Sequence, residues 1–302
     1  MKKIYVIGSS NTDMVVKCDR LPRPGETVVG GVFYQVHGGK GANQAVAAAR
    51  MGGNVHFFCR VGDDANGQAS LQAYKKEGID IRYIRIKEGG QSGVALIMVD
   101  EQGENSIAVA SGVNADMKPA DIDPLTALLM PGDVVLLQLE IPLETVAHAA
   151  AVGRKQGAMV VLDPAPVPRQ SLPDALLAHV DFLLPNEHEA AALTGTDAST
   201  QAIADFMQAK RIKNVILTAG ARGCVWISEH QTQAYPAFKV QALDSTAAGD
   251  AFAGSFAVAL SEGMETQAAI QFAQKAAALS VIRMGAQPSL PTRAEMEAFT
   301  GA

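Results

Sequence analysis

Short apolar segments alternate regularly with longer amphipathic segments from about residue 121 onward, and this alternation constrains the fold more than any other feature. The apolar segments have the length of buried strands, and the others have the apolar spacing of helices. Strands that alternate with helices predict crossover connections and a parallel sheet covered on both faces. The predicted strands are 134–139, 159–162, 182–184 and 215–218, and the predicted helices are 143–156, 187–193, 200–209, 251–262, 266–283 and 293–299.

The first third of the chain departs from this rhythm. Two strand-rich segments, at about 12–38 and 92–110, interrupt the alternation of strands and helices. Two such insertions can pair into one small sheet at the edge of the main domain. This sheet would act as a lid. We therefore predict a single domain, 1–302, with a three-layer α/β/α architecture, a mostly parallel central sheet and a small β-sheet lid. The elements predicted in this third are strands at 4–7, 27–36, 55–61, 93–99 and 106–110, and helices at 42–51 and 66–76.

The composition excludes several classes of partner. The chain has 302 residues, 48% of them hydrophobic, and a formal net charge of −6 without any basic block, so we expect no nucleic-acid partner. No stretch reaches the roughly 18 apolar residues of a membrane span. The N-terminus, MKKIYVIG, predicts a strand and not a signal peptide. Three scattered cysteines predict neither a disulfide framework nor a zinc site, and we expect a cytoplasmic protein.

The segment 244–254, DSTAAGDAFAG, carries the strongest chemical signal. Small residues precede Asp250 and an alanine-rich helix follows it, so the backbone at this helix start can approach a ligand closely. Amides at a helix N-terminus stabilise negative charge. A carboxylate beside them can accept a hydroxyl proton during phosphoryl transfer. The alternative interpretation is an ordinary helix N-terminus with an aspartate that favours the helix dipole.

A glycine-rich turn, GGKGANQA at 38–45, leads directly into a predicted helix. It presents Lys40 and Asn43 one helical turn apart, and an ammonium with an amide suits recognition of a polyhydroxy compound. The turn is not a Walker A loop, because the required spacing of glycine, lysine and serine or threonine is absent. A plain strand-to-helix turn is the alternative interpretation.

Further polar side chains follow predicted strands at the sheet edge where open α/β sheets bind ligands. Asn11 and Asp13 follow the first strand, and Glu140 follows the strand 134–139. Asparagine and aspartate are also common turn residues, which is the alternative for this group.

Two other turns suggest a nucleotide and its magnesium ion. Asn186 and Glu189 lie between a strand and a helix, where they can hold magnesium indirectly, although helix-capping residues would look the same. The segment 218–223, TAGARG, ends another strand, and its glycines can admit phosphates, as those of many turns can. The six histidines are not grouped at the spacing of metal ligands.

Together these motifs resemble the ribokinase-like (PfkB) family of carbohydrate kinases over residues 4–299. The two signatures are GGKGANQAVAAA at 38–49 and DSTAAGDAFAG at 244–254, and shorter matches follow in order at 11–13, 62–64, 138–140, 185–187 and 285–289. The resemblance implies transfer of a phosphoryl group from ATP to O5 of D-ribose, giving D-ribose 5-phosphate. It also implies a homodimer formed through the lid.

The resemblance implies a role for individual residues. Asp250 would be the base, and the amides of Ala247, Ala248 and Gly249 would form an anion hole. The sugar site would consist of Asn11, Thr12, Asp13, Gly39, Lys40, Gly41, Ala42, Asn43, Glu140 and Asp250. The ATP site would consist of Asn186, Thr218, Ala219, Gly220, Ala221, Arg222, Gly223, Gly249, Asp250 and Gln274.

The resemblance also implies two kinds of cation. Asn186 and Glu189 match an Asn-x-x-Glu motif associated with magnesium and phosphate. Thr246 stands where an apolar residue is frequent, and Gln274 stands where a histidine can lie near the adenine. A monovalent cation, usually potassium, would be held mostly by backbone carbonyls of Asp244, Thr246, Ser280, Arg283, Gly285 and Ser289.

Three other functions are weighed against this one. A kinase of a related sugar or a nucleoside, such as deoxyribose, would share the same motifs. A regulator that binds sugar or nucleotide without catalysis is disfavoured by the intact Asp250 and its small-residue surroundings. A dinucleotide-dependent oxidoreductase is disfavoured because residues 8–11, GSSN, lack the G-x-G-x-x-G fingerprint after the first strand.

Overall fold

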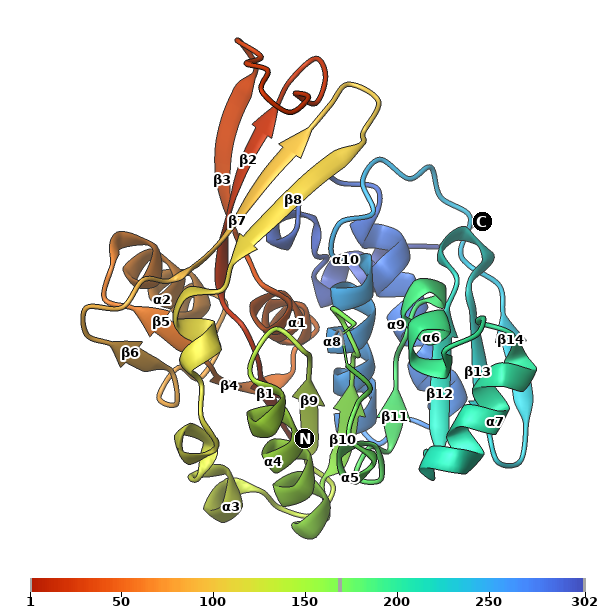
Figure 1. Ribbon diagram of the computed structural model, residues 1–302. Helices are drawn as coiled ribbons and strands as arrows, with labels where there is room; N and C mark the ends of the chain where they lie inside the picture. The colour runs from red at the N-terminus through yellow and green to blue at the C-terminus, as the bar shows by residue number, and fades with distance from the viewer. Residues whose placement is uncertain (1, 168–169, 301–302) are drawn as a thin grey trace.

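An eight-stranded sheet forms the centre of the protein, of which the computed structural model describes residues 2–167 and 170–300 (Figure 1). The strand order is β14-β13-β12-β11-β10-β9-β1-β4, parallel from β12 to β4, with β13 and β14 added antiparallel at one edge. The strands are β1 (Lys3–Ile7), β4 (Asn54–Phe58), β9 (Val134–Leu137), β10 (Met159–Leu162), β11 (Phe182–Leu183), β12 (Asn214–Thr218), β13 (Cys224–Ser228) and β14 (Thr232–Tyr235).

Helices cover both faces of this sheet, which confirms the predicted α/β/α architecture (Figure 1). Side chains alternate along a strand, so Ile4 and Val6 pack with α1, α8 and α9, whereas Tyr5 and Ile7 pack with α4 and α7. The first layer contains α1 (Lys40–Arg50), α2 (Ala65–Lys76), α8 (Ala248–Ser261), α9 (Thr266–Ser280) and α10 (Arg293–Ala298). The second contains α3 (Leu125–Leu128), α4 (Leu143–Lys155), α5 (Asp174–Leu177), α6 (Glu187–Thr194) and α7 (Thr200–Lys210).

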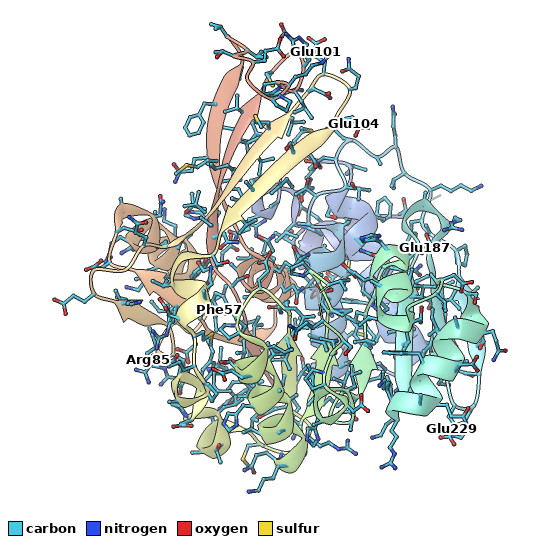
Figure 2. All side chains as sticks on the ribbon, in the orientation of Figure 1. Phe57, Arg85, Glu101, Glu104, Glu187 and Glu229 are labelled. Atoms are coloured by element: carbon cyan, nitrogen blue, oxygen red, sulfur yellow. The ribbon has the colours of Figure 1, made fainter. Side chains whose placement is uncertain are left out.

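A second, four-stranded sheet projects beyond the carboxyl ends of the central strands, and we call it the lid sheet (Figure 1). Figure 2 shows Glu101 and Glu104 at its far tip, next to the turn between its last two strands. Its order is β3-β2-β7-β8, from β2 (Asn11–Lys17), β3 (Val32–Gly38), β7 (Gly93–Val99) and β8 (Asn105–Ala110). Because β2 begins directly after the turn that ends β1, the base of the lid sheet is tied to the centre of the main sheet.

Several element boundaries differ from the predictions. The strand predicted at 27–36 begins only at Val32, because Gly30 and Gly31 adopt positive φ angles of 106° and 95°, which do not continue a strand. The strand predicted at 55–61 is two strands, since the chain leaves the central sheet at Cys59 and β5 (Arg60–Gly62) pairs with β6 (Arg85–Lys87). Asn11 and Asp13, for which an ordinary turn was the alternative interpretation, lie in β2.

The remaining differences lie toward the C-terminus. Strands β13 and β14 were not predicted, since both are short and partly polar. Helix α9 ends at Ser280 and not at 283. Short 3₁₀ segments, η1 (Gly112–Asp116), η2 (Pro119–Ile122), η3 (Gly220–Arg222) and η4 (Gln287–Ser289), connect the main elements. Within the described ranges, no helix has the length and apolar character needed to cross a bilayer.

Candidate active site

Two cavities open at the carboxyl edge of the central sheet, and the predicted site residues divide between them. The smaller cavity, of about 370 Å³, lies at the base of the lid sheet and is lined by Asn11, Asn114 and Glu140 among others. The larger cavity has a volume of about 680 Å³, within the usual range for a nucleotide-sized ligand. Its lining includes Lys40, Asp163, Asn186, Glu189, Thr218, Gly220, Ala221, Gly223, Ala247, Ala248, Gly249, Asp250 and Gln274, but not Ala219 or Arg222.

Asp250 lies in the first turn of α8 and lines the larger cavity. Its carboxylate is held on both sides: Asn43 Nδ2 donates to Oδ2 at 2.9 Å, and Gln44 Nε2 donates to Oδ1 at 3.0 Å. Burial raises the pKa of Asp250, and the charge of Lys40 together with these two hydrogen bonds opposes that rise. A buried carboxylate oriented by two donors has the geometry of a general base.

The backbone before Asp250 leaves amide groups free to bind an anion. Ala247 adopts a left-handed conformation with φ of 60°, and α8 begins at the next residue. The amide of Ala248 donates to the carbonyl of Ser245 at 3.2 Å, so the structure uses this member of the predicted anion hole internally. The amides of Gly249 and Asp250 have no backbone acceptor in the described part of the chain. Free amides at a helix start bind anions.

The packing around Gly249 does not require a glycine at this position. A Cβ atom built there meets no protein atom within 4 Å. We expect Gly249→Ala to leave the thermal unfolding temperature nearly unchanged but to lower kcat at least about tenfold, because the added methyl group would occupy the space of the transferring phosphoryl group. Thermal unfolding and ADP release measured on the same preparation test this. Unchanged kcat would show that no reacting group approaches this amide.

Lys40 and Glu140 connect the glycine-rich turn to the end of β9. The backbone amide of Lys40 donates to Glu140 Oε2 at 2.9 Å, and Ser9 Oγ donates to the same oxygen at 2.5 Å. Burial alone would lower the pKa of Lys40, but the carboxylates of Asp250, Asp163, Glu140 and Glu189 outweigh it and raise the pKa. Lys40 lines the larger cavity, and its contact with the sugar stays a prediction.

Among the residues predicted for the sugar, Asn11 and Glu140 line the smaller cavity, and Lys40 and Asp250 line the larger one. Burial, followed by the charges of Glu140 and Asp250, raises the pKa of Asp13 to about 7. Asn43 Oδ1 and Thr12 Oγ1 are buried and have no hydrogen-bond partner among the described residues, so they are available to a hydroxylated ligand. Asn114 Nδ2 donates to Asn11 Oδ1 at 2.8 Å, which fixes the orientation of the Asn11 amide group.

The glycines and Ala42 of the turn have steric roles. Gly39 has a φ of 88°, and a Cβ atom there would lie 2.7 Å from the amide nitrogen of Asn11. A Cβ atom at Gly41 would lie 2.5 Å from the amide nitrogen of Ser9. Ala42 is fully buried, and its amide donates to the carbonyl of Ser9 at 2.9 Å. The helix α1 can therefore begin directly against the 8–11 turn, which brings Asn43 to Asp250.

On the nucleotide side, several predicted residues also have structural partners. Asn186 and Glu189 form a reciprocal capping box at the start of α6, with both hydrogen bonds at 2.9 Å, which is the structural alternative considered for them. Arg222 forms an ion pair with Glu187 and does not line the cavity. Gln274 Nε2 donates to the carbonyl of Tyr235 at 3.1 Å and lines the cavity from α9.

The predicted monovalent-cation residues come from two loops that meet beside the start of α8. Burial would raise the pKa of Asp244, but hydrogen bonds from Thr246 and from the amide of Gly285 at 2.7 Å outweigh it and lower the pKa. The hydroxyls of Ser280 and Ser289 donate to carbonyls of their own turns, and Arg283 pairs with Glu295. The cation site that the resemblance implies, held mostly by backbone carbonyls, stays a prediction.

Sequence reasoning missed four polar residues of the site: Ser9, Gln44, Asn114 and Asp163. Gln44 and Asn114 give no local signal, because their importance depends on partners more than 100 residues away. Asp163 did give a signal, since it follows β10 in the same way that Glu140 follows β9.

Comparisons with known proteins show the family to which this chain belongs. Residues 1–293 match the family described as pfkB family carbohydrate kinase, and the chain belongs to that family. It is 41% identical over 302 residues to a ribokinase of Haemophilus influenzae, covering 99% of this chain and 98% of the relative. It is 38% identical over 293 residues to a deoxyribokinase of Salmonella typhi, covering 96% and 95%. A solved structure of Arabidopsis thaliana ribokinase complexed with ribose and ATP superposes with a TM-score of 0.88 at 32% identity, covering 98% of both chains.

Proposed function

We propose that this carbohydrate kinase transfers the γ-phosphoryl group of ATP to O5 of D-ribose and forms D-ribose 5-phosphate. The observation that carries the proposal is the position of Asp250, whose carboxylate is oriented by Asn43 and Gln44 at the wall of the larger cavity. The relatives described as ribokinases, at up to 41% identity, support ribose as the acceptor.

The chemistry follows from the placement of charge. Asp250 accepts the proton of the sugar hydroxyl as its oxygen attacks the γ-phosphorus, and the phosphorus–oxygen bond to ADP breaks on the opposite side. The amide of Gly249 and the ammonium of Lys40 stabilise the negative charge on the transferring group. Closure of the lid sheet would exclude water, which could otherwise accept the phosphoryl group.

Two cations complete the proposal. A nucleotide-bound magnesium ion needs few protein ligands, and Glu189 lines the cavity with one carboxylate oxygen outside the capping box. Magnesium would neutralise charge on the phosphates. A potassium ion at the Asp244 and Gly285 loops would stabilise the backbone that leads into the Gly249 amide, because Asp244 already joins these two loops.

Deoxyribose is the second candidate substrate, favoured by the 38% identity to a deoxyribokinase. A site that hydrogen-bonds a hydroxyl discriminates strongly against an analogue that lacks it, because its buried polar groups are left unpaired. Asp13, Asn43 and Glu140 are the groups that would make this distinction.

The proposal is tested by ADP release with MgATP and a panel of pentoses, hexoses and nucleosides, with and without potassium. Turnover on ribose that potassium increases would support both the substrate and the cation site. Turnover on another sugar alone would keep the kinase mechanism and change the substrate. No turnover on the whole panel, with ATP still bound, would favour the non-catalytic regulator.

We also propose that the protein is a homodimer formed through the outer face of the lid sheet. Asp13 lies on the inner face, near Glu140 and Asp250, so its neighbours Met14 and Leu96 point outward. Phe33 lies on that outer face and is 61% exposed, and Leu96 is 57% exposed. Ile107 and Val109, 54% and 52% exposed, pair with Ile97 and Ala95 and lie on the inner face, so the lid sheet exposes apolar side chains on both faces. Exposed apolar side chains of this kind favour association with a second copy.

Leu96→Lys is expected to convert the dimer into a monomer, because a charge would replace an apolar side chain at the centre of the outer face. Sedimentation velocity measures the change. Ile86→Lys is the matched control, since Ile86 is 52% exposed in β6, outside the lid sheet, and this variant should remain dimeric. A Leu96→Lys protein that is still a dimer would place the interface elsewhere.

Finally, we propose a cytoplasmic enzyme whose ligands are ATP and a small sugar, without a nucleic-acid or membrane partner. Cys18, Cys59 and Cys224 are all buried free thiols, which suits a reducing compartment. ATP, the proposed phosphoryl donor, is abundant there.

A further inference from the structure

A buried amide joins two carboxylates at the centre of the site. Gln44 lies on α1 and is fully buried. Its Nε2 donates to Asp163 Oδ2 at 2.7 Å and to Asp250 Oδ1 at 3.0 Å, so both amide hydrogens are used. Its Oε1 accepts a hydrogen bond from Gln138 Nε2 at 2.6 Å, which fixes the orientation of the amide plane.

Asp163 is a buried acid, and the packing of the core does not require a carboxylate at this position. It follows β10, is only 7% exposed and forms no salt bridge in the part of the chain that the structure describes. Burial raises its pKa to about 8, Lys40 opposes the rise, and Asp250 adds to it. An acid in such surroundings costs stability. Its one side-chain hydrogen bond is the one from Gln44, which points to a role in the site.

We propose that Asp163 and Gln44 are positioning residues for phosphoryl transfer: Asp163 fixes the amide of Gln44, and this amide holds the carboxylate of Asp250 against the acceptor hydroxyl. The inference rests on the proposed kinase function and assigns that function two residues outside the predicted site. Asn43 holds Oδ2 of Asp250 and Gln44 holds Oδ1, so the two amides together fix rotation of the carboxylate about its Cβ–Cγ bond.

Loss of this support should affect the reaction more than binding. A rotated or loosened base misaligns proton transfer, and misplacement of a reacting group by about 1 Å can cost about 10²-fold in rate. Gln44 lines neither cavity and Asp163 lines only the larger one, so neither is among the residues proposed to bind the sugar. The expected signature is therefore a fall in kcat with little change in KM for the sugar.

The experiment compares the kinetics of the intact protein with those of Gln44→Met, Asp163→Ala, Asp163→Asn and the Gln44→Met/Asp163→Ala double variant, using the best acceptor of the sugar panel. We expect kcat to fall about 10- to 100-fold in Gln44→Met and about tenfold in Asp163→Ala, with KM within about threefold. Asp163→Asn keeps an oxygen acceptor for Gln44 and should recover most of kcat. The double variant should be no worse than Gln44→Met, because Asp163 acts through Gln44.

A matched control separates positioning from stability. Asp133 is also a buried aspartate, 2% exposed, but it lies at the start of β9, where its carboxylate accepts from the amides of Lys3 and Met130. Asp133→Ala should lower the thermal unfolding temperature and leave kcat unchanged. If Asp163→Ala does not fold, Gln44→Met and Asp163→Asn still test the inference.

The pH profile gives a second readout. Gln44 donates to Asp250 and so lowers its pKa, which means that Gln44→Met should move the acid limb of kcat/KM to higher pH. Lys40, Glu140 and Asp163, the other charged groups around Asp250, are unchanged in this variant.

Four results would overturn the inference. The first is an unchanged kcat in Gln44→Met, and the second is an Asp163→Asn variant that is as slow as Asp163→Ala. The third is a double variant whose kcat falls by the product of the two single effects. The fourth is a loss of kcat in Asp163→Asn that added magnesium restores. The last would make Asp163 a metal-facing acid. An intact protein that is inactive on every sugar would overturn the proposed function and this inference together, whereas an active one with unaffected variants would overturn only the inference.

Discussion

Replacing Asp250 with asparagine is expected to lower kcat by about 10²- to 10⁴-fold and to leave sugar binding measurable. Asparagine has nearly the same shape and fills the same buried position between Asn43 and Gln44, but it cannot accept the hydroxyl proton. ADP release gives kcat, and calorimetric titration with the sugar gives the binding constant.

Asp133→Asn serves as the control, since it makes the same chemical change at the opposite end of the sheet, far from either cavity. It is expected to keep full kcat. A fall of less than about tenfold in Asp250→Asn, or roughly 1.4 kcal/mol on the barrier, would contradict the assignment of Asp250 as base.

Lys40→Met should give the second large effect, a fall of about 10²- to 10³-fold in kcat/KM for MgATP. The charges of four carboxylates act on the Lys40 ammonium, so its loss would remove the cation proposed to attract the phosphates and would leave those acids without its compensating charge. The ammonium opposes the rise in the pKa of Asp250, and its removal should move the acid limb of the pH profile to higher pH. Steady-state kinetics across a pH series measures both changes.

Two further variants make this result specific. Lys40→Arg keeps the charge and should retain more activity than the methionine variant. Lys87→Met removes a surface ammonium that pairs with Asp116 at 2.6 Å, and it should have no effect on turnover. If Lys40→Met keeps the kcat/KM of the intact protein for MgATP, the phosphates of ATP do not interact with this lysine.

The architecture was predictable because its strands are buried on both faces. Every residue of β9 is buried, as are the last four residues of β1, so each is an apolar run that stands out in sequence. Prediction failed where burial is incomplete: β13 and β14 lie toward the edge and contain polar residues such as Ser228 and Gln233. It also failed at Cys59, where the largely apolar segment 55–61 passes from one sheet to another without a turn residue to mark the change.

The site was predictable only in part, for a related reason. Motifs contiguous in sequence, such as 38–45 and 244–254, led to Asn43 and Asp250, and the structure brings these two side chains within 2.9 Å of each other. That Lys40 lines the larger cavity could not be derived from the sequence, because the carboxylates whose charges act on it come from four other parts of the chain. Gln44 lies within the signature at 38–45, but the neighbouring sequence does not distinguish an amide that bridges two carboxylates from an amide that is simply buried in the core.

The order of the strands has a consequence for how such an enzyme can diversify. Asn11 and Glu140 follow β1 and β9, Asp163 follows β10, and Asn186 and Thr218 lie at the ends of β11 and β12, so the site runs along the sheet edge. Most residues proposed for the sugar therefore precede residue 141 and most of those proposed for the nucleotide follow residue 185, whereas Lys40 and Asp250 stand outside this division. Mutation or recombination can alter the acceptor half, including the lid sheet, while the donor half stays intact. New acceptor specificities can thus arise in this lineage without rebuilding ATP recognition.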